Sequence, residues 1–421
     1  MGASMHLAHV APRYFPAISG SELYIQEVSE ILQQRRHKVK VFCSNALDFN
    51  VFGNLKGKII EDQHSKLNGV DIFRYPIKYI PGISFFVNNS YSAYKKVLKQ
   101  MNLWQVISSN YLNVLTNGPF TPELWLQLMR DHPDIIHSVT MPFATNLFAL
   151  LAGKLKKVPT ICTPFFHFGN PRYDNPTYIE FLNKFDRILT CTQRESQYLI
   201  KNGIQKEKIR HIHMGINPEK LLRGNPGRFR QRFNLGEDQK LILFCGYKNF
   251  EKGAISLLLS MKHVIAKFPN CKFILIGPAS TTFNRTKKKL GDLRKNLLNL
   301  GVIPYYSNLK LDVFAAQDLY VMPSRSDAFG IAFLEAWINR KPVIGARVGA
   351  TPEIIRNGEN GILVPFHSPL KLAEAICDLL ENEKEALRLG ENGYQRYRDY
   401  TWENVATKVE RIYQELIQHQ S

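Results

Sequence analysis

Short hydrophobic runs alternate along the chain with longer stretches whose hydrophobic residues recur at helical spacing. Near the start, residues 5–12 form a short apolar run and residues 38–45 alternate between apolar and polar, as β-strands do. Residues 21–34, between them, carry hydrophobic residues at roughly helical spacing. This strand–helix–strand order predicts a βαβ unit, and therefore a parallel sheet with right-handed crossovers.

The same rhythm recurs and then starts afresh after residues 208–220. Strand-like and helical stretches alternate up to about residue 192, and a second series runs from residue 241. We therefore predict two α/β domains of similar build. The first covers residues 1–210, and the second covers residues 211–400.

The overall charge limits the class of partner. The 421 residues include 55 Lys and Arg against 36 Asp and Glu, a net charge of +19. Such a surface attracts polyanions, anionic lipid or phosphorylated substrates. No zinc-finger or RNP-type motif accompanies the charge, so nucleic acid is not an expected partner.

No apolar run approaches the roughly 20 residues of a membrane helix. The six cysteines are scattered without a CxxC pair, which predicts reduced core thiols.

One segment, residues 77–118, mixes aromatic residues with lysines. Tyr91, Tyr94 and Leu98 share a helical face, and Lys95 and Lys96 lie among them. One interpretation is a helix packed on its own domain. The other is an amphipathic surface that docks on an anionic membrane or a lipid-linked acceptor.

Several catalytic motifs are missing from the sequence. There is no GxxxxGK[ST] and no complete GxGxxG after the first strand, which disfavours P-loop and dehydrogenase chemistry. GxSxG and HExxH are also absent, which disfavours hydrolase elbows and zinc peptidases. No Asp-x-Asp offers a carboxylate clamp for a metal on a diphosphate, so we expect no metal site.

Two loops after predicted strands are candidate anion sites. Gly20 lies before the first helix, where a glycine lets the backbone approach a phosphate, although a plain turn explains it equally well. In the second domain, Lys248 and Lys252 follow the strand that ends near Cys245. A lysine there neutralises a diphosphate leaving group without a metal. The alternative is that both are solvated surface lysines.

The stretch SRSDAFGIAFLEAW, residues 324–337, carries the richest chemistry. A predicted strand ends before it, and the amides of Phe329, Gly330 and Ile331 would open the following helix as an anion site. Asp327 and Glu335 lie too far apart to share a proton or a metal, so we expect each to bind hydroxyls on a different part of one long ligand. A nucleotide sugar fits this description. The alternative makes Asp327 a helix cap and Glu335 a surface residue.

These residues resemble the family 4 retaining glycosyltransferases. The resemblance covers nearly the whole chain and is most specific over residues 323–365. The other similar stretches are 9–42, 133–138, 208–220 and 401–416. It implies the GT-B fold, an α/β architecture of two Rossmann-like domains whose parallel sheets face across a deep cleft. The second domain would bind the nucleotide sugar, and the terminal helix, residues 401–421, would cross back onto the first domain.

The resemblance also implies roles for the candidate residues of the second domain. Asp327 and Glu335 fall on the two glutamates that the family separates by seven residues, where the first contacts the donor sugar and the second the ribose. Residues 329–331 match the backbone that meets sugar and phosphate. Lys252 matches the diphosphate-binding lysine, and Tyr305 lies in the segment that usually holds the base.

In the first domain, Gly20 matches the family's phosphate-loop glycine. His167 lies near the family's active-site histidine, and the alternative is a histidine at a strand end without a catalytic role.

The sequence departs from the family twice. Asp327 stands where Glu is usual, which puts the donor sugar in question. Tyr247 stands where an arginine usually partners the lysine, and Lys248 is the candidate to replace it, without the bidentate fork of arginine.

The expected protein is therefore a retaining hexosyltransferase with Asp327, Lys252 and His167 as catalytic residues. It would move a sugar from a UDP- or GDP-sugar to a hydroxyl of a lipid-linked or other saccharide, without metal or cofactor. We expect it in the cytoplasm, with peripheral contact to an anionic membrane. Two alternatives remain: a nucleotide-sugar epimerase of the same fold, and a basic protein that binds nucleic acid.

Overall fold

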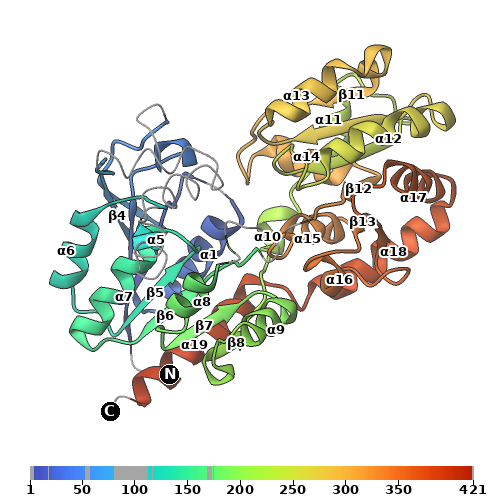
Figure 1. Cartoon of the computed structure of the whole chain (residues 1–421). Coiled ribbons are helices and arrows are strands. Elements are labelled where there is room, and N and C mark those ends of the chain that lie inside the picture. The colour runs from blue at the N-terminus through green and yellow to red at the C-terminus, as the bar shows by residue number, and fades with distance from the viewer. Residues whose placement is uncertain are drawn as a thin grey trace, which may run out of the picture. The chain divides into compact units, whose positions relative to one another are not determined.

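The computed structural model describes residues 4–17, 19–52, 57–79, 112–115, 117–167, 173, 175–325 and 327–419. The chain divides into two compact units (Figure 1). Unit 1 comprises residues 1–213 and 402–421, and unit 2 comprises residues 214–401. Each unit is built on a largely parallel β-sheet with helices between successive strands, which confirms the predicted α/β class. Most of the aromatic and lysine-bearing segment 77–118 lies outside the described residues.

The described part of unit 1 contains an eight-stranded sheet of order β3-β4-β2-β1-β5-β6-β7-β8. All neighbouring strands are parallel except β3 and β4, which form an antiparallel pair. The strands are β1 (His6–Ala11), β2 (Lys38–Ser44), β3 (His64–Leu67), β4 (Val70–Tyr75), β5 (Ile135–Val139), β6 (Thr160–Thr163), β7 (Arg187–Thr190) and β8 (Ile209–His211). Strands β1 and β5 are buried along almost their whole length, as expected for the centre of a covered parallel sheet.

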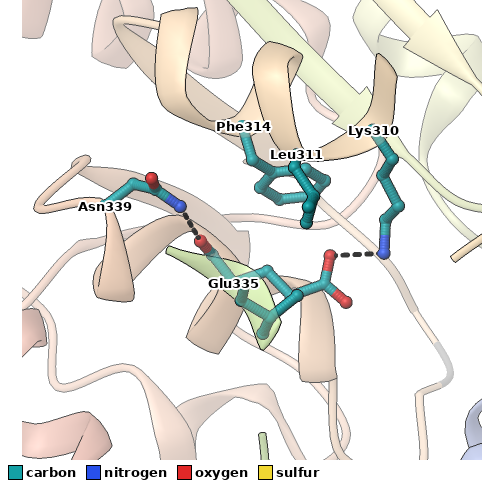
Figure 2. A pocket seen from close by; sticks show the side chains of 6 residues that line it. Lys310, Leu311, Phe314, Glu335 and Asn339 are labelled. Carbon is teal, nitrogen blue, oxygen red and sulfur yellow. Dashed lines mark hydrogen bonds and ion pairs between the residues drawn. The ribbon is translucent and has the colours of Figure 1, made fainter. Parts of the chain in front are cut away.

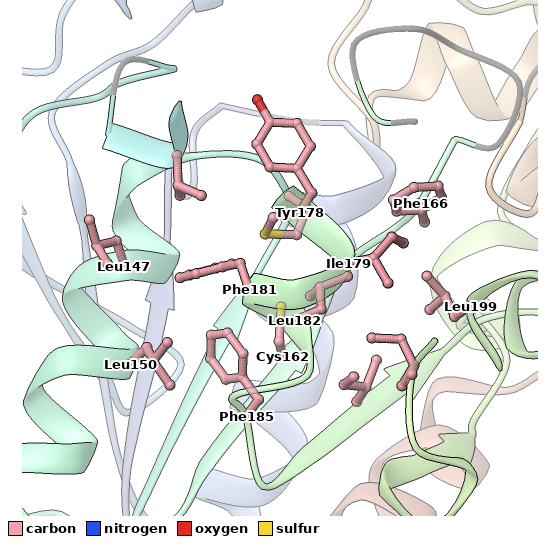
Figure 3. Close-up of a cluster of buried hydrophobic side chains, with 14 residues drawn as sticks. Leu147, Leu150, Cys162, Phe166, Tyr178, Ile179, Phe181, Leu182, Phe185 and Leu199 are labelled. Atoms are coloured by element: carbon pink, nitrogen blue, oxygen red, sulfur yellow. The ribbon is translucent and has the colours of Figure 1, made fainter. Parts of the chain in front are cut away.

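Helices cover the sheet of unit 1 and bury its side chains. They are α1 (Gly20–Gln34), α5 (Leu112–Leu115), α6 (Pro122–Arg130), α7 (Ala144–Lys156), α8 (Pro176–Leu182), α9 (Gln193–Lys201) and α19 (Trp402–Gln418). One hydrophobic cluster joins α7, α8 and β6, with Leu147, Phe181 and Cys162 among its members (Figure 3). All six cysteines are free, and only Cys245 is partly exposed.

The terminal helix α19 belongs to unit 1 although its sequence follows unit 2. It packs against α1, and its Tyr413 hydroxyl lies 3.1 Å from His9 Nε2 and 2.5 Å from His137 Nδ1. At the helix surface Arg35 pairs with Glu403 and Glu410. The chain therefore crosses back to its first domain, as the resemblance implied.

Unit 2 contains a six-stranded parallel sheet of order β11-β10-β9-β12-β13-β14. The strands are β9 (Leu241–Cys245), β10 (Lys272–Ile276), β11 (Leu297–Asn299), β12 (Leu319–Met322), β13 (Val343–Ala346) and β14 (Ile362–Val364). This is the doubly wound order, in which the direction of strand addition reverses between the first strand, β9, and the fourth, β12.

The helices of unit 2 lie between these strands. They are α10 (Pro218–Leu221), α11 (Pro226–Arg232), α12 (Ala254–Lys267), α13 (Thr281–Lys288), α14 (Asn308–Ala316), α15 (Ile331–Ile338), α16 (Thr351–Ile354), α17 (Pro369–Glu381) and α18 (Glu383–Tyr397). In the described part of the chain, no helix combines the length and apolar character needed to cross a membrane.

Candidate functional site

The reversal between β9 and β12 positions the candidate residues of unit 2. The carboxyl ends of these adjacent strands lead into two loops, residues 246–253 and residues 323–330. In open parallel sheets, ligands bind beside the carboxyl ends of the strands at such a switch point. Lys252 lies on the first loop and Asp327 on the second, so the sheet order brings together two residues that are 75 positions apart.

Lys252 and Asp327 form a direct ion pair. Lys252 Nζ donates to Asp327 Oδ2 at 2.7 Å, and the two side chains are 24% and 14% exposed. The main-chain amide of Lys252 donates to Asn249 Oδ1 at 2.8 Å, which fixes the backbone below the ammonium. Both charges therefore remain accessible from solvent, and a diphosphate could engage the ammonium.

Gly330 is the N-cap of α15 and has φ +97°, a conformation that favours glycine. A Cβ there would lie 2.8 Å from the Phe333 ring, so a side chain would also clash. The side chain of Phe329 is buried against Tyr400, so only its backbone could face a ligand. Ile331 is the first helical residue. The turn thus opens a helix N-terminus at the switch point, as predicted for an anion site.

Glu335 lies one turn into α15 and is 3% exposed, which excludes the alternative that it is a surface residue. Its carboxylate forms an ion pair with Lys310 of α14, with Lys310 Nζ 2.7 Å from Oε2 (Figure 2). The same ammonium lies 3.5 Å from the centre of the Tyr305 ring. The family resemblance assigned Glu335 to the ribose and Tyr305 to the base, and Lys310, which the sequence did not indicate, contacts both side chains.

A small pocket adjoins this ion pair. Its apolar lining comes from Leu221, Leu311 and Phe314, and Asn339 donates from its side chain to the Glu335 carbonyl at 2.9 Å. Burying two charges costs solvation that a single contact recovers only in part. A carboxylate and an ammonium kept beside a pocket are therefore suited to a polar ligand such as a ribose, whose hydroxyls donate to the carboxylate.

Lys248 occupies a different environment from the one the sequence suggested. It is 1% exposed, and its ammonium donates to Asn299 Oδ1 at 2.8 Å and to the Leu300 carbonyl at 2.5 Å. Burial, together with the nearby charge of Lys287, lowers the pKa of Lys248 to about 8. The interpretation as a solvated surface lysine is wrong. The geometry also does not favour Lys248 as a diphosphate ligand, because its ammonium already binds the last residue of β11 and the residue after it.

In unit 1, Gly20 is the exposed first residue of α1, directly after the loop from β1. That loop is fastened by Arg13, whose Nη2 lies 2.8 Å from Glu22 Oε1. The Arg13 guanidinium also lies 3.5 Å from the centre of the Phe49 ring. Strand order reverses between β1 and β5, so Gly20 lies at the switch point of its own sheet.

His167 follows β6 in unit 1 and is partly buried, with its ring 5.0 Å from that of Tyr173. The backbone beside it is held by Glu195, a buried residue of α9. Glu195 accepts from the Phe166 amide at 2.8 Å and from the Cys191 amide at 2.7 Å. The strand end therefore has a fixed position, and the catalytic role of His167 stays a prediction.

Three further charged residues beside the candidate residues were not indicated by the sequence. Lys310 pairs with Glu335, while Glu251 and Arg325 pair with each other beside Lys252 and Asp327. The one available signal was position along the chain, because Glu251 is next to Lys252 and Arg325 is two positions from Asp327. Among the described residues, no group of three or more His, Cys, Asp or Glu side chains could hold a metal ion.

Parts of both units match known protein families. Residues 227–396 match the family described as glycosyl transferases group 1, and residues 102–220 match glycosyltransferase family 4. An uncharacterized glycosyltransferase of Methanocaldococcus jannaschii is 30% identical over 407 residues, which cover 96% of each chain. A D-inositol 3-phosphate glycosyltransferase of Corynebacterium glutamicum is 27% identical over 254 residues, 58% of this chain and 60% of that protein. The chain likewise spans 53% and 58% of two further relatives of the same description.

Solved structures share the fold. HepE of Anabaena, in complex with UDP and glucose, superposes with a TM-score of 0.69 at 16% identity over 97% of this chain and 99% of that one. WaaG, a glycosyltransferase involved in lipopolysaccharide biosynthesis, gives a TM-score of 0.66 at 16% identity over 96% and 99%. An Escherichia coli protein bound with UDP-2-fluoro glucose gives 0.70 at 13% identity over 97% and 98%.

Proposed function

The chain belongs to the family 4 glycosyltransferases of the GT-B superfamily, and on that premise we propose that it transfers a sugar from a nucleotide-sugar donor to an acceptor hydroxyl. The observation that carries this proposal is the placement of two acids in unit 2. Asp327 pairs with Lys252 at the switch point, and Glu335 pairs with Lys310 beside the Tyr305 ring. Two separate acid–lysine pairs suit the sugar-diphosphate and nucleoside ends of one donor.

In the proposed reaction, the bond between the anomeric carbon and the diphosphate breaks and a bond to the acceptor oxygen forms on the same face. The nucleoside diphosphate leaves with the proton of the acceptor hydroxyl. Lys252 and the N-terminus of α15 stabilise the charge that develops on the leaving group. Asp327 orients the sugar, His167 lies on the acceptor side, and the outcome is retention of configuration. We propose that no metal or cofactor takes part, because Lys252 supplies the positive charge.

The donor is proposed to be a UDP- or GDP-hexose. Structures of the same fold hold UDP with glucose and UDP-2-fluoro glucose, which supports a nucleoside diphosphate sugar. Asp327 stands where the family usually has Glu, and its shorter side chain would select the sugar.

We propose a lipid-linked or other saccharide as the acceptor, at a membrane surface facing the cytoplasm. The net charge of +19 favours an anionic partner. A relative in this family acts, by its description, on D-inositol 3-phosphate, which is also anionic. The membrane contact is assigned to the lysines near residues 95–99, which lie outside the described residues. If anionic vesicles bind a Lys95→Glu, Lys96→Glu and Lys99→Glu variant as well as wild type, that assignment is wrong.

A thermal-shift screen of UDP, GDP and their sugars tests the function first. We expect one nucleoside diphosphate to raise the unfolding temperature, and EDTA to leave the subsequent transfer unchanged. Release of nucleoside diphosphate only when acceptor is added indicates transfer, whereas an epimerase would convert the donor without acceptor. A salt-sensitive gel shift with nucleic acid and no stabilisation by any donor would instead favour the nucleic-acid-binding alternative. The anomeric configuration of the first product, read by NMR, tests retention.

A further inference from the structure

The two loops at the switch point of unit 2 are joined by a second ion pair next to that of Lys252 and Asp327. Arg325 Nη2 lies 2.6 Å from Glu251 Oε1, and Arg325 Nε donates to Oε2 at 2.9 Å. The main-chain amide of Arg325 also donates to the Glu251 carbonyl at 2.7 Å. The first loop therefore presents an acid and then a lysine, and the second presents an arginine and then an acid.

We propose that Glu251 and Arg325 form a positioning pair that fixes Lys252 and Asp327 for the diphosphate and sugar of the donor. The inference rests on the proposed function and adds two residues to it. Neither residue needs to touch the donor. Each acts through its neighbour, because the pair sets the distance and orientation of the two loops.

The backbone around Lys252 is held on both sides. Its own amide donates to Asn249 Oδ1, and the preceding residue, Glu251, is bound through both its carboxylate and its carbonyl. On the other side, Gly253 has φ +78°, and a Cβ there would lie 2.3 Å from the Pro323 carbonyl oxygen. The Lys252 side chain could therefore move from Asp327 to an arriving phosphate without any displacement of the loop.

Arg325 also contacts the rim of the sheet beyond these two loops. Its guanidinium lies 5.9 Å from the centre of the Phe250 ring and 5.8 Å from that of Phe366, which follows β14. The two rings pack edge-to-face at 5.3 Å. Arg325 thus links the segments that follow β9, β12 and β14. The planar guanidinium of an arginine suits contacts with a carboxylate and aromatic rings better than the ammonium of a lysine would.

Stability alone does not explain the pair. The side chains of Arg325 and Glu251 are 47% and 36% exposed, and ion pairs with such exposure contribute little to folding. Unit 2 offers a matched control in Arg388 and Glu385. That pair is also bidentate, at 2.7 and 2.8 Å, and 47% and 34% exposed, but it joins residues of one helix, α18.

The test compares nucleoside diphosphate with nucleoside monophosphate. Glu251→Gln and Arg325→Met are titrated calorimetrically with UDP and UMP, or with GDP and GMP if wild type prefers guanine. This comparison distinguishes an effect at the diphosphate end of the site from an effect at the nucleoside end. We expect each variant to weaken diphosphate binding about tenfold or more while monophosphate binding stays within about twofold, because small displacements of positioned groups are costly. The double variant should lose no more than either single one.

Charge exchange and the control pair complete the test. The variant Glu251→Arg with Arg325→Glu should regain part of the diphosphate affinity, and Arg325→Lys should regain less because it lacks the fork. Glu385→Gln and Arg388→Met should match wild type. Equal loss of both nucleotides, or no loss of either, would overturn the positioning role. If wild type binds no nucleotide and no donor, the proposed function itself is wrong; if wild type binds and the variants match it, only the inference fails.

Discussion

The ammonium of Lys310 lies 2.7 Å from the carboxylate of Glu335, and both side chains are at most 5% exposed. The pair joins α14 to α15 beside a small pocket. Removing one partner of a buried pair leaves the other charge buried without a counter-ion and destabilises the fold. Replacing both partners by apolar residues often leaves the free energy of unfolding unchanged or raises it. This asymmetry separates the contribution of the pair to folding from its contribution to ligand binding.

The first prediction follows from this asymmetry. Lys310→Met should lower the unfolding free energy by about 3 kcal/mol, because Glu335 is left buried without its counter-ion. Lys310→Met combined with Glu335→Leu should recover most of that stability. Neither variant should bind UMP or GMP, since the ribose hydroxyls lose their acceptor or its orientation. Denaturant unfolding and calorimetry measure the two effects, and nucleotide binding by the double variant would contradict the ribose assignment.

Lys252→Ala should cost catalysis far more than stability. The ammonium is partly exposed, so its loss should move the unfolding temperature little, whereas a lost donor to a developing charge typically lowers kcat about a hundredfold or more. The measurement is kcat with the donor that the thermal screen identifies. Lys371→Ala is a suitable control, because Lys371 forms an exposed pair within α17. Full turnover in Lys252→Ala would refute its role.

Asp327 should set donor preference. Asp327→Ala should reduce turnover strongly with little effect on folding, as for Lys252. Asp327→Glu restores the residue usual in the family and extends the carboxylate by one methylene. We expect the ratio of kcat/KM between two sugars on the same nucleotide to change, while binding of the nucleoside diphosphate alone stays the same. An unchanged ratio would show that Asp327 does not contact the sugar.

Gly330→Ala should destabilise unit 2 and impair the diphosphate site. An L-residue at φ +97° costs about 1–2 kcal/mol, and the new Cβ would meet the Phe333 ring at 2.8 Å. The variant should show a lower unfolding temperature and weaker binding of nucleoside diphosphate. Gly203→Ala is informative beside it, because Gly203 also has positive φ but has no atom within 4 Å of its Cβ position. If both variants bind diphosphate equally well, the tight turn is not needed for binding.

Acid should weaken the docking of α19 in unit 1. Burial lowers the pKa of His9 to about 3, and burial with the neighbouring His9 lowers that of His137 well below its usual value. Both rings lie against the Tyr413 hydroxyl, with Ser29 and Thr163 as their other partners. The folded state takes up these protons only at lower pH than the unfolded state does. The free energy of unfolding is therefore at its full value above about pH 6.5 and falls as the pH drops below that value.

The expected loss is about 1.4 kcal/mol per pH unit for each histidine that stays neutral. Thermal unfolding from pH 7 to pH 5 measures this slope, and His137→Gln should reduce it by about one proton. His64→Gln serves as the control, because His64 is 57% exposed. A slope that stays the same in His137→Gln would show that this histidine does not couple to folding.

The sequence by itself determined the alternation of strands and helices and the two α/β units. Both follow from hydrophobic periodicity, which reports which face of each element is buried. The return of the last helix to the first unit came from the family resemblance, because periodicity within a helix does not indicate its partner. The sequence also located Gly330 between Asp327 and Glu335, because a glycine directly before an apolar helix indicates a tight turn at the helix N-terminus. It missed the short antiparallel pair β3 and β4, although the Asn68-Gly69 turn between them is a typical hairpin signal.

The tertiary structure decided which charges meet. Periodicity along one element carries no information about its partners on another, so the sequence could not show that Lys310 of α14 pairs with Glu335 of α15. Nor could it distinguish Lys248, which is buried and binds the end of β11, from Lys252, which is four residues away and pairs with Asp327. Strand order set these contacts, because it placed the loops after β9 and β12 side by side.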